Sequence, residues 1–207
     1  MKGYYFITDT DLSKAGNKSD VEQAVAAGVR IVQYRNKTGE TRELFEEARM
    51  LKDLCRNTTF IINDRIDIAL AVEADGVHVG QDDMPYANAR KLLGPDKIIG
   101  VTVHNLEEAI QAQDQGADYL GVSPIFATTT KADAGEPAGI SLLKEIKEKC
   151  TVPLIAIGGV TLGNASEVVA AGADGLCAIS AVVTAERVKD EVEKFQRLFN
   201  EPAPPCP

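Results

Sequence analysis

Residues 121–131 gather side chains that are suited to binding phosphate. The segment begins as an apolar run typical of a buried strand, and it continues into Thr128, Thr129, Thr130 and Lys131. Hydroxyl groups are neutral hydrogen-bond donors and a lysine ammonium is a point charge, so a loop of this composition can hold phosphate oxygens. The sequence therefore predicts an anion site just past the end of this strand.

Glycines predict a second anion site further along the chain. The run Ile157-Gly158-Gly159-Val160 closes an apolar strand, and glycines there let backbone N–H groups approach an anion closely. The last strand-like run ends at Ile179-Ser180. In a barrel of alternating strands and helices, the loops after the final two strands are the usual phosphate site. Thr102, at the end of residues 98–103, offers a further hydroxyl to a phosphate.

Two cations and an amide alternate along residues 31–37. Gln33, Arg35 and Lys37 share one face by the two-residue period of a strand. We interpret them as an anion site at the open end of the barrel, the alternative being a strand end whose charges are simply solvated. Arg35, Lys37 and Lys131 are the groups expected to act catalytically, because they can offset charge that develops on a leaving phosphate.

Carboxylates stand at the ends of two neighbouring strands. Asn63-Asp64 closes residues 59–64, and Asp83 follows residues 76–81. Mg²⁺ prefers oxygen ligands and often takes one or two carboxylates together with substrate phosphates. The alternative is that both aspartates cap helices, where a carboxylate is also favoured. Because the pair lies beside a predicted anion site, we favour a magnesium site.

A histidine is expected inside the barrel. Val77 and Val79 should face the surrounding helices, which turns His78 toward the interior. The residue is either a core histidine with satisfied hydrogen bonds or a substrate contact. His104, after residues 98–103, could flank a helix or act as a base.

The elements that position these residues alternate from strand to helix along the whole chain. Short Val- and Ile-rich runs are typical of a parallel sheet buried on both faces. Eight such units in about 200 residues predict a single (β/α)₈ TIM barrel over residues 1–200, in the α/β class. An open doubly wound sheet is the rival, but Thr8-Asp9-Thr10 lacks the glycine-rich turn expected after its first strand. The proline-rich residues 201–207 are predicted to be a disordered tail. The predicted strands are 3–8, 31–36, 59–64, 76–81, 98–103, 119–124, 153–158 and 175–180.

Helix signals fill the intervals between these runs. Ser19-x-x-Glu22 is a capping-box pattern that predicts the start of the first helix. Asn105 is predicted to cap a helix that runs to Gln115. The other predicted helices are 40–56, 140–149, 164–171 and 184–199.

The bulk composition narrows the class of partner. The net charge of −9 disfavours nucleic acid, which calls for a basic face, but a few local cations suffice for small phosphorylated ligands. No apolar stretch is long enough to span a membrane, and the N-terminus shows no secretory leader, so a cytoplasmic protein is expected. Cys177 is expected in the core, and no disulfide is expected. The oligomeric state stays open, a homo-oligomer included.

These sites together indicate two phosphorylated groups. The cations and carboxylates after the second to fourth strands suit a pyrophosphate with Mg²⁺, whereas the hydroxyls and glycines after the sixth to eighth strands suit a monophosphate. A reaction that expels pyrophosphate and joins the remainder to a phosphorylated partner would use both.

The chain resembles the thiamine-phosphate synthase family over nearly all of residues 3–199. Family members fold as a (β/α)₈ barrel and join hydroxymethylpyrimidine pyrophosphate to a thiazole phosphate, releasing pyrophosphate. The motifs that carry the resemblance are Gln33-x-Arg35-x-Lys37, Asn63-Asp64, His78-Val79-Gly80-Gln81-x-Asp83, Gly121 to Lys131, Ile157-Gly158-Gly159 and Ile179-Ser180.

The resemblance implies a role for each matching residue. It implies that Asp64 and Asp83 bind Mg²⁺. The implied contacts to the pyrimidine pyrophosphate are Gln33, Arg35, Lys37, Asn63 and Lys131. The implied contacts to the thiazole phosphate are Thr128, Thr129, Thr130, Gly159, Ile179 and Ser180.

Three positions depart from the family pattern, and two other functions compete with the synthase. Tyr34 and Asn36 stand where Leu and Glu are common, and both should point away from the barrel interior. Thr102 stands where Ser is common, which keeps the hydroxyl. One competitor is a thiazole tautomerase on the same barrel, which needs neither Mg²⁺ nor a pyrophosphate site. The other is a non-catalytic barrel that senses a phosphate ligand, which leaves the paired carboxylates unexplained.

Overall fold

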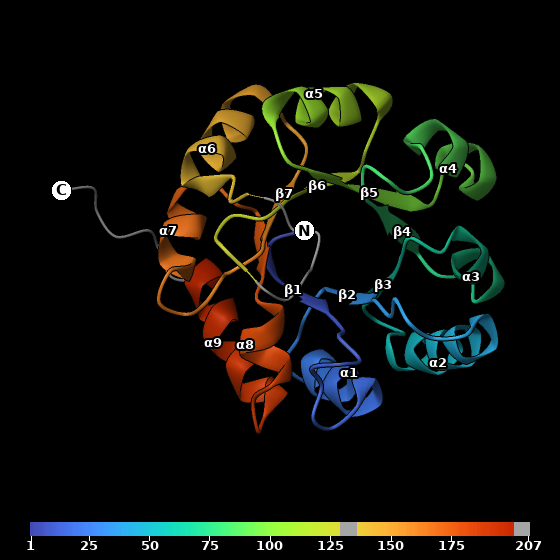
Figure 1. Ribbon diagram of the computed structural model, residues 1–207. Coiled ribbons are helices and arrows are strands. Elements are labelled where there is room, and N and C mark those ends of the chain that lie inside the picture. The colour runs from blue at the N-terminus through green and yellow to red at the C-terminus, as the bar shows by residue number, and fades with distance from the viewer. Residues whose placement is uncertain (129–135, 201–207) are drawn as a thin grey trace.

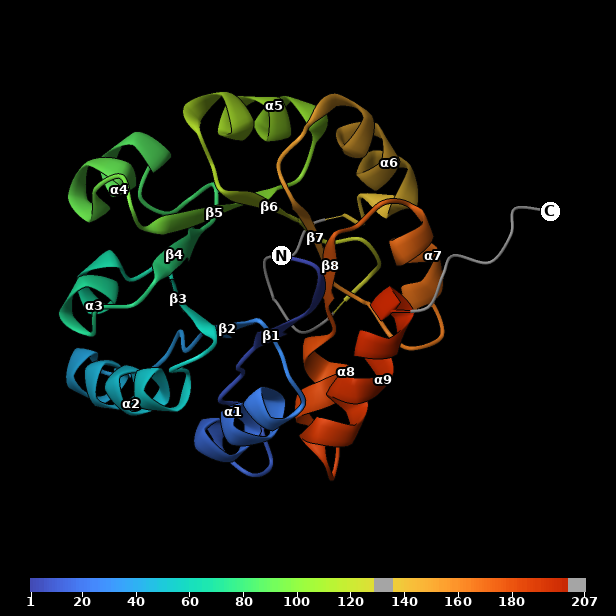
Figure 2. The same ribbon diagram turned by 180° about the vertical axis from the view of Figure 1, so that it is seen from behind.

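The computed structural model describes residues 1–128 and 136–200. Within them, eight parallel strands close into a barrel in the order β1-β2-β3-β4-β5-β6-β7-β8. Helices form an outer ring around the strands, seen from one end in Figure 1 and from the other in Figure 2. The closed ring confirms the predicted (β/α)₈ barrel and contradicts the open doubly wound sheet. Thr129, Thr130, Lys131 and the predicted tail at 201–207 lie outside the described residues.

The strands and helices alternate along the chain. The strands are β1 Gly3–Ile7, β2 Ile31–Tyr34, β3 Thr59–Asn63, β4 Gly76–Val79, β5 Ile98–Val103, β6 Tyr119–Val122, β7 Leu154–Ile157 and β8 Gly175–Cys177. The helices are α1 Asn17–Ala26, α2 Thr41–Leu54, α3 Ile66–Ala71, α4 Tyr86–Leu93, α5 Leu106–Gln115, α6 Gly139–Lys149, α7 Ala165–Ala170, α8 Ile179–Val183 and α9 Val188–Asn200.

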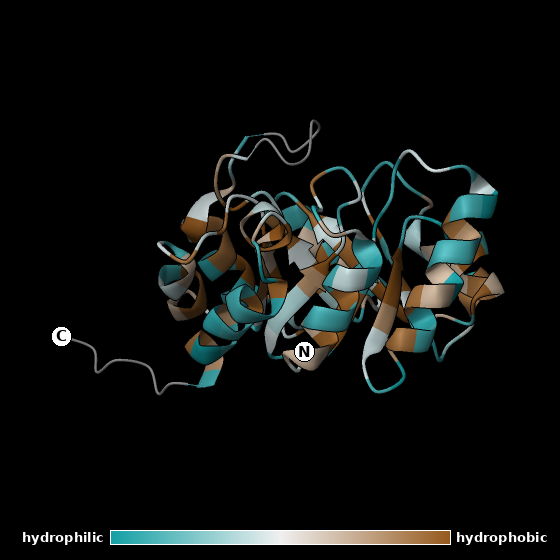
Figure 3. Cartoon of the chain, turned by 90° about the horizontal axis from the view of Figure 1, so that it is seen from below, coloured by the Kyte–Doolittle hydropathy of each residue, from teal (hydrophilic) through white to brown (hydrophobic). Residues whose placement is uncertain are grey.

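The hydrophobic core lies on both faces of the barrel wall. Every residue of β1, β2, β4, β6, β7 and β8 is buried, as expected for a parallel sheet covered by helices. In Figure 3 the apolar colour gathers on the strands and on the helix sides that face them. Cys177 lies in this core as predicted, and Cys55, Cys150 and Cys177 form no disulfide. The helices found in residues 1–128 and 136–200 all fall short of what crossing a membrane requires.

Helix starts test the capping predictions. The Asn105 side chain accepts a hydrogen bond from the Glu108 N–H at 2.9 Å, which confirms the predicted start of α5. The predicted start at Ser19 is wrong, because α1 already begins at Asn17 after Gly16. The Ser19 hydroxyl lies inside the helix and accepts from the Gln23 side chain.

The predicted strands mostly run too far at their carboxyl ends. β3 stops at Asn63 because Asp64 has a φ of 59°, which lies outside the extended region. β8 stops at Cys177, so Ile179 and Ser180 lie in the first turn of α8 rather than in a strand. The predicted helix 184–199 starts later, at Val188. The polar residues at the strand ends therefore lie in loops that the barrel holds at one rim.

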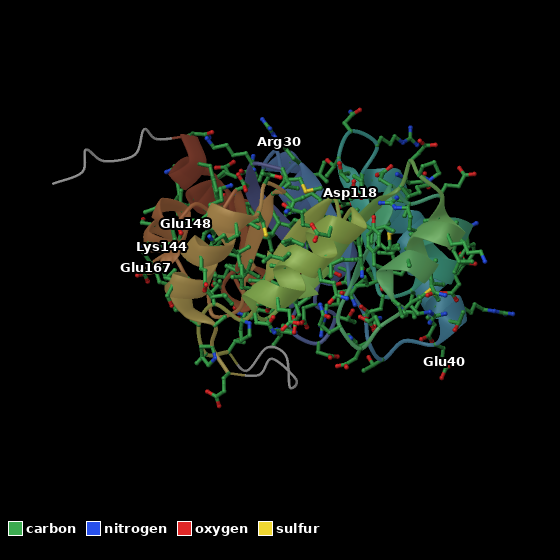
Figure 4. All side chains as sticks on the ribbon, turned by 90° about the horizontal axis from the view of Figure 1, so that it is seen from above. Arg30, Glu40, Asp118, Lys144, Glu148 and Glu167 are labelled. Carbon is green, nitrogen blue, oxygen red and sulfur yellow. The ribbon has the colours of Figure 1, made fainter. Side chains whose placement is uncertain are left out.

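A repeated aspartate stabilises the opposite rim of the barrel. Asp75, Asp118 and Asp174 precede β4, β6 and β8. Each accepts a hydrogen bond from a backbone N–H of the preceding strand, at 2.7 Å from Phe60, 2.8 Å from Ile99 and 2.9 Å from Leu154. Each aspartate also forms an ion pair with a lysine or arginine of α2, α4 or α6, namely Lys52, Arg90 and Lys147. Figure 4 shows Asp118 and Arg30, which precede strands, at one end of the molecule, and Glu40, which follows β2, at the other.

Removing one of these aspartates should lower the free energy of unfolding and leave the loops at the opposite rim unchanged. Asp118→Ala should cost about 1–2 kcal/mol of unfolding free energy, because it leaves the buried Ile99 N–H without its acceptor. The partly exposed Arg90 pair should contribute little. Urea unfolding measures the loss, and Asp114→Ala on the exposed face of α5 is the control. Equal stability of the two variants would contradict this account.

Candidate active site

A polar cavity lies at the carboxyl ends of β2 to β6. It brings together predicted residues from four different strand ends, namely Arg35, Lys37, Asn63, Asp64, His78, Asp83 and Thr102. Gly80, Gln81, Asp82, His104 and Ser123 complete its lining. The two predicted metal ligands and three of the predicted pyrophosphate residues, Arg35, Lys37 and Asn63, are therefore neighbours in space.

The side chains in β2 and just after it lie as the two-residue period predicts. Gln33 is buried in the barrel, the Arg35 side chain is 14% exposed and the Lys37 side chain is 48% exposed, so the three rise from the interior to the rim. The alternative, a strand end whose charges are simply solvated, is wrong for Arg35, because its side chain is enclosed. Tyr34 and Asn36 point elsewhere: the Tyr34 hydroxyl donates to Glu47 on α2, and the Asn36 side chain accepts from the backbone of Thr38.

Neither predicted metal ligand caps a helix. The N-cap positions of α3 and α4 are Arg65 and Pro85, and neither position has a side-chain capping bond. Asp64 instead pairs with Lys37 Nζ at 2.8 Å, and Asp83 accepts a hydrogen bond from the Gly80 N–H at 2.7 Å. The helix-cap alternative is therefore wrong for both carboxylates.

Asp64 lies in an electrostatically unfavourable position. Burial raises the pKa of its carboxyl group, and the carboxyl group of Asp83 beside it raises the pKa further, while Lys37 acts in the opposite direction. Burial works against the charge on Lys37, but the hydrogen bond and charge of Asp64 outweigh it, so the Lys37 pKa is raised. Two carboxyl groups held together in this way favour a cation between them.

The composition of the cavity fits a divalent cation. Its lining carries three carboxylates and two cationic side chains, a net charge of minus one with the histidines neutral. A pyrophosphate needs a positive site, which a bound Mg²⁺ would provide by bringing the net charge to plus one. Within residues 1–128 and 136–200 no cluster of three or more His, Cys, Asp or Glu side chains could hold a metal alone. The donor set therefore fits Mg²⁺ held by two carboxylates and completed by substrate phosphate.

The raised pKa of Asp64 predicts a stability difference that depends on pH. A carboxyl group with a higher pKa in the folded than in the unfolded state costs stability once the pH exceeds its unfolded value of about 3.9, and the cost is complete above the folded value. Without Mg²⁺, Asp64→Asn should therefore melt at a higher temperature than the parent protein at pH 7. The difference should close as the pH falls below about 4.

A neighbouring carboxyl group provides the control for this measurement. The hydrogen bond from Arg65 lowers the pKa of Asp67, so its ionised form favours the folded state. Asp67→Asn should lose a little stability at pH 7, the opposite sign. A lower melting temperature for Asp64→Asn at pH 7 would show that the Lys37 pair outweighs the burial of the carboxylate.

Beneath the cavity, hydrogen-bonded side chains cross the barrel interior. The Gln33 amide donates to the Tyr5 hydroxyl at 2.9 Å, and that hydroxyl lies 2.7 Å from the Tyr119 hydroxyl. The Tyr119 hydroxyl lies 3.0 Å from His78 Nδ1, and His78 Nε2 lies 2.7 Å from Thr102 Oγ1. His78 thus faces the interior as predicted and has satisfied hydrogen bonds while it also lines the cavity. The Thr102 hydroxyl, predicted for a phosphate, has His78 as its partner in this structure.

A second cavity lies at the ends of β6 to β8. Its lining includes Thr128, Gly158, Gly159, Ile179 and Ser180. Because Ile179 and Ser180 begin α8, their N–H groups have no partner within the helix. Ser123, at the end of β6, lines both cavities, so two ligands bound in them would be neighbours.

The Gly158-Gly159 turn is built for close approach of the backbone. Both glycines have positive φ, 95° and 64°. A Cβ on Gly159 would lie 2.6 Å from the Ala127 carbonyl oxygen, and one on Gly158 would lie 2.7 Å from Pro124 Cβ. The Phe126 N–H donates to the Gly158 carbonyl at 3.0 Å. The turn therefore has no room for a side chain, and it holds the loop after β6 against the end of β7.

Two further lining residues, Gln81 and His104, had no assigned role in the predicted substrate or metal site. Gln81 donates to the Thr102 carbonyl at 2.6 Å, and His104 Nδ1 bonds to the Ser123 carbonyl. Tyr5 and Tyr119 in the interior network were also missed. No sequence signal pointed to either tyrosine, because every residue of β1 and β6 is buried and an apolar strand gives no sign that a hydroxyl has a partner inside the barrel.

Comparison with known proteins identifies the family of the chain. A family model described as thiamine monophosphate synthase matches residues 4–182. The chain is 53% identical over 193 residues to a thiamine-phosphate synthase of Methanosarcina barkeri, covering 93% of this chain and 88% of that protein. It is 50% identical over 199 residues to one of Chloroflexus aurantiacus, covering 95% and 92%.

A solved structure gives the same result. The thiamine phosphate pyrophosphorylase from Pyrococcus furiosus superimposes with a TM-score of 0.89 at 40% identity, covering 96% of this chain and 95% of that one. The family model spans most of the chain. Both relatives are at least 50% identical to this chain over nearly its whole length. The chain therefore belongs to the thiamine monophosphate synthase family.

Proposed function

We propose that this protein is a thiamine-phosphate synthase, a transferase. It would join 4-amino-5-hydroxymethyl-2-methylpyrimidine pyrophosphate to hydroxyethylthiazole phosphate, giving thiamine monophosphate and pyrophosphate. The observation that carries the proposal is that Asp64 and Asp83 line one cavity together with Arg35 and Lys37. A tautomerase or a phosphate sensor has no use for that arrangement.

The two cavities would divide the substrates between them. Arg35, Lys37 and Asn63 would hold the pyrophosphate, with Asp64 and Asp83 as magnesium ligands. Thr128, Gly159 and the first turn of α8 at Ile179 and Ser180 would hold the thiazole phosphate. Thr129, Thr130 and Lys131 keep the roles that the family resemblance implies, outside the described residues. Gln33, His78 and Thr102 would lie between, where the interior network fixes their side chains.

The reaction needs little acid–base chemistry. The bond between the pyrimidine methylene carbon and the pyrophosphate oxygen breaks, and the electron pair leaves with pyrophosphate. The thiazole nitrogen then donates its lone pair to that carbon, and no proton has to move. Bound Mg²⁺ would neutralise charge on the phosphates. Arg35 and Lys37 would stabilise the same developing charge, and they are held ready before the substrate arrives.

We propose that pyrophosphate leaves before the new bond forms, because the cavity is rich in groups that stabilise a leaving anion. An electron-withdrawing substituent on the pyrimidine ring should then slow single-turnover chemistry by roughly a hundredfold or more, equivalent to about 2.7 kcal/mol. Rapid-quench measurements with the substituted and parent substrates provide the comparison. A substituent effect below about twofold would indicate direct displacement by the thiazole instead.

Pyrophosphate release tests the function itself. The proposal predicts release only when both substrates and Mg²⁺ are present, and loss of release when Mg²⁺ is chelated. A tautomerase would isomerise a thiazole substrate without producing pyrophosphate. A sensor would bind phosphate ligands without turnover.

A further inference from the structure

The end of β1 holds the backbone of Arg35 from the side. Thr8 is fully buried directly after this strand. Its hydroxyl oxygen accepts a hydrogen bond from the Arg35 N–H at 2.9 Å, and the same hydroxyl donates to the Arg35 carbonyl at 3.2 Å. One side chain thereby satisfies both backbone groups of Arg35 and fixes the direction in which its side chain leaves the strand.

The next residue holds the guanidinium group. Asp9 is 5% exposed, and its Oδ2 lies 3.5 Å from Arg35 Nη1. Asp9 is itself held, because its Oδ1 accepts from the Leu12 N–H at 3.1 Å and its carbonyl accepts from the Ser13 N–H at 2.9 Å. The guanidinium is thus attached to a rigid turn of the loop between β1 and α1.

Arg35 stands between two spaces. On one side is the cavity with Asp64 and Asp83, and on the other is an outer pocket bordered by Asp9, Thr10 and Asp11. Arg35 Nε is buried without a hydrogen-bond partner. An unpartnered buried donor is unfavourable, so the arrangement persists only because the surrounding groups enforce it. Thr8 and Asp9 are the groups in position to do so.

The negative charge of Asp9 is unfavourable at this position unless it has a specific partner. A carboxylate next to an anion site weakens the attraction for a phosphate, and a buried carboxylate is costly to desolvate. Its bond to the Leu12 N–H could be made equally well by a neutral asparagine. Among the residues that the structure describes, the contact with Arg35 is the one that uses the negative charge.

We propose that Asp9 is a positioning residue for substrate binding, which sets the Arg35 guanidinium in the orientation that receives the pyrophosphate group. Thr8 fixes the backbone of Arg35 for the same purpose. This proposal deepens the proposed function and rests on it. It makes a prediction that opposes simple electrostatics: removing the negative charge of Asp9 weakens the binding of pyrophosphate.

The test is calorimetric binding of inorganic pyrophosphate in the presence of Mg²⁺. Asp9→Asn keeps an acceptor for the Leu12 N–H but removes the charge that holds Arg35. Its affinity should fall roughly tenfold or more, the scale of a misplaced binding group. Asp11→Asn is the matched control, since Asp11 is exposed and borders the same outer pocket. It removes the same charge from the same loop and should bind as tightly as the parent protein or slightly more tightly.

A double-mutant cycle separates positioning from a structural effect. In an Arg35→Ala background, Asp9→Asn should cause no further loss of affinity, because the group that it orients is gone. In steady-state kinetics, Asp9→Asn should raise KM for the pyrimidine pyrophosphate and leave KM for the thiazole phosphate unchanged. Thr8→Val, which removes only the hydroxyl, should change affinity in the same direction and serves if Asp9→Asn folds poorly.

The opposing outcomes are distinct. Equal or tighter binding by Asp9→Asn, or an equal loss with and without Arg35, would overturn the proposal. Absence of binding by the parent protein would instead refute the proposed function, and the inference about Asp9 with it.

Discussion

Replacing either Asp64 or Asp83 by alanine is expected to reduce kcat/KM by roughly a hundredfold or more, the scale of losing one electrostatic stabiliser. The two carboxyl groups are neighbours in one cavity, and carboxylate oxygens are ligands that Mg²⁺ prefers. Loss of either should also raise the concentration of Mg²⁺ needed for half-maximal pyrophosphate release. Initial rates measured across a magnesium titration provide both quantities.

Stability measurements on the same variants distinguish loss of a magnesium ligand from loss of a helix cap. A lost helix cap would cost about 1 kcal/mol of stability and leave activity in place. Neither carboxylate makes a capping bond, and burial raises the pKa of Asp64, so Asp64→Ala should lose activity without losing stability. Asp67→Ala, on the adjacent helix α3, is the control and should turn over like the parent protein. Full activity of Asp64→Ala would exclude it as a magnesium ligand.

Gly159→Ala is expected to cause a large loss of stability. The residue has a φ of 64°, and its new Cβ would lie 2.6 Å from a backbone oxygen. The left-handed conformation costs about 1–2 kcal/mol for an alanine, and forcing an extra methyl into a packed region costs about 1–3 kcal/mol. Together these predict a loss of roughly 2–5 kcal/mol in urea unfolding.

The same substitution should affect one substrate more than the other. Gly159 lines the cavity at β6 to β8, so KM for the thiazole phosphate should rise while KM for the pyrimidine pyrophosphate changes little. Gly163→Ala is the matched control, because the nearest atom to its new Cβ would be 3.7 Å away. A stable Gly159→Ala protein with both KM values unchanged would show that this turn does not shape the phosphate site.

Much of the fold follows from local sequence. Buried parallel strands are apolar on both faces, so runs such as Ile98–Val103 are visible without a structure, and this strand has the predicted bounds. The two-residue period also predicts which side chains turn inward, as it does for Gln33 and His78. Local signals fail at the strand ends, where a single backbone angle such as the φ of Asp64 stops the strand early.

What the amino-acid sequence determined by itself is the order of elements, the barrel, and the identity of the polar residues at one rim. Only the tertiary structure decided which of them are partners. Lys37 pairs with Asp64, Arg35 pairs with Asp9, and the Tyr5 hydroxyl meets that of Tyr119 across the barrel. These residues are far apart in the chain, and no local preference relates them. Their distances depend on barrel closure and on loop conformations, which arise from packing of the whole chain rather than from any one segment.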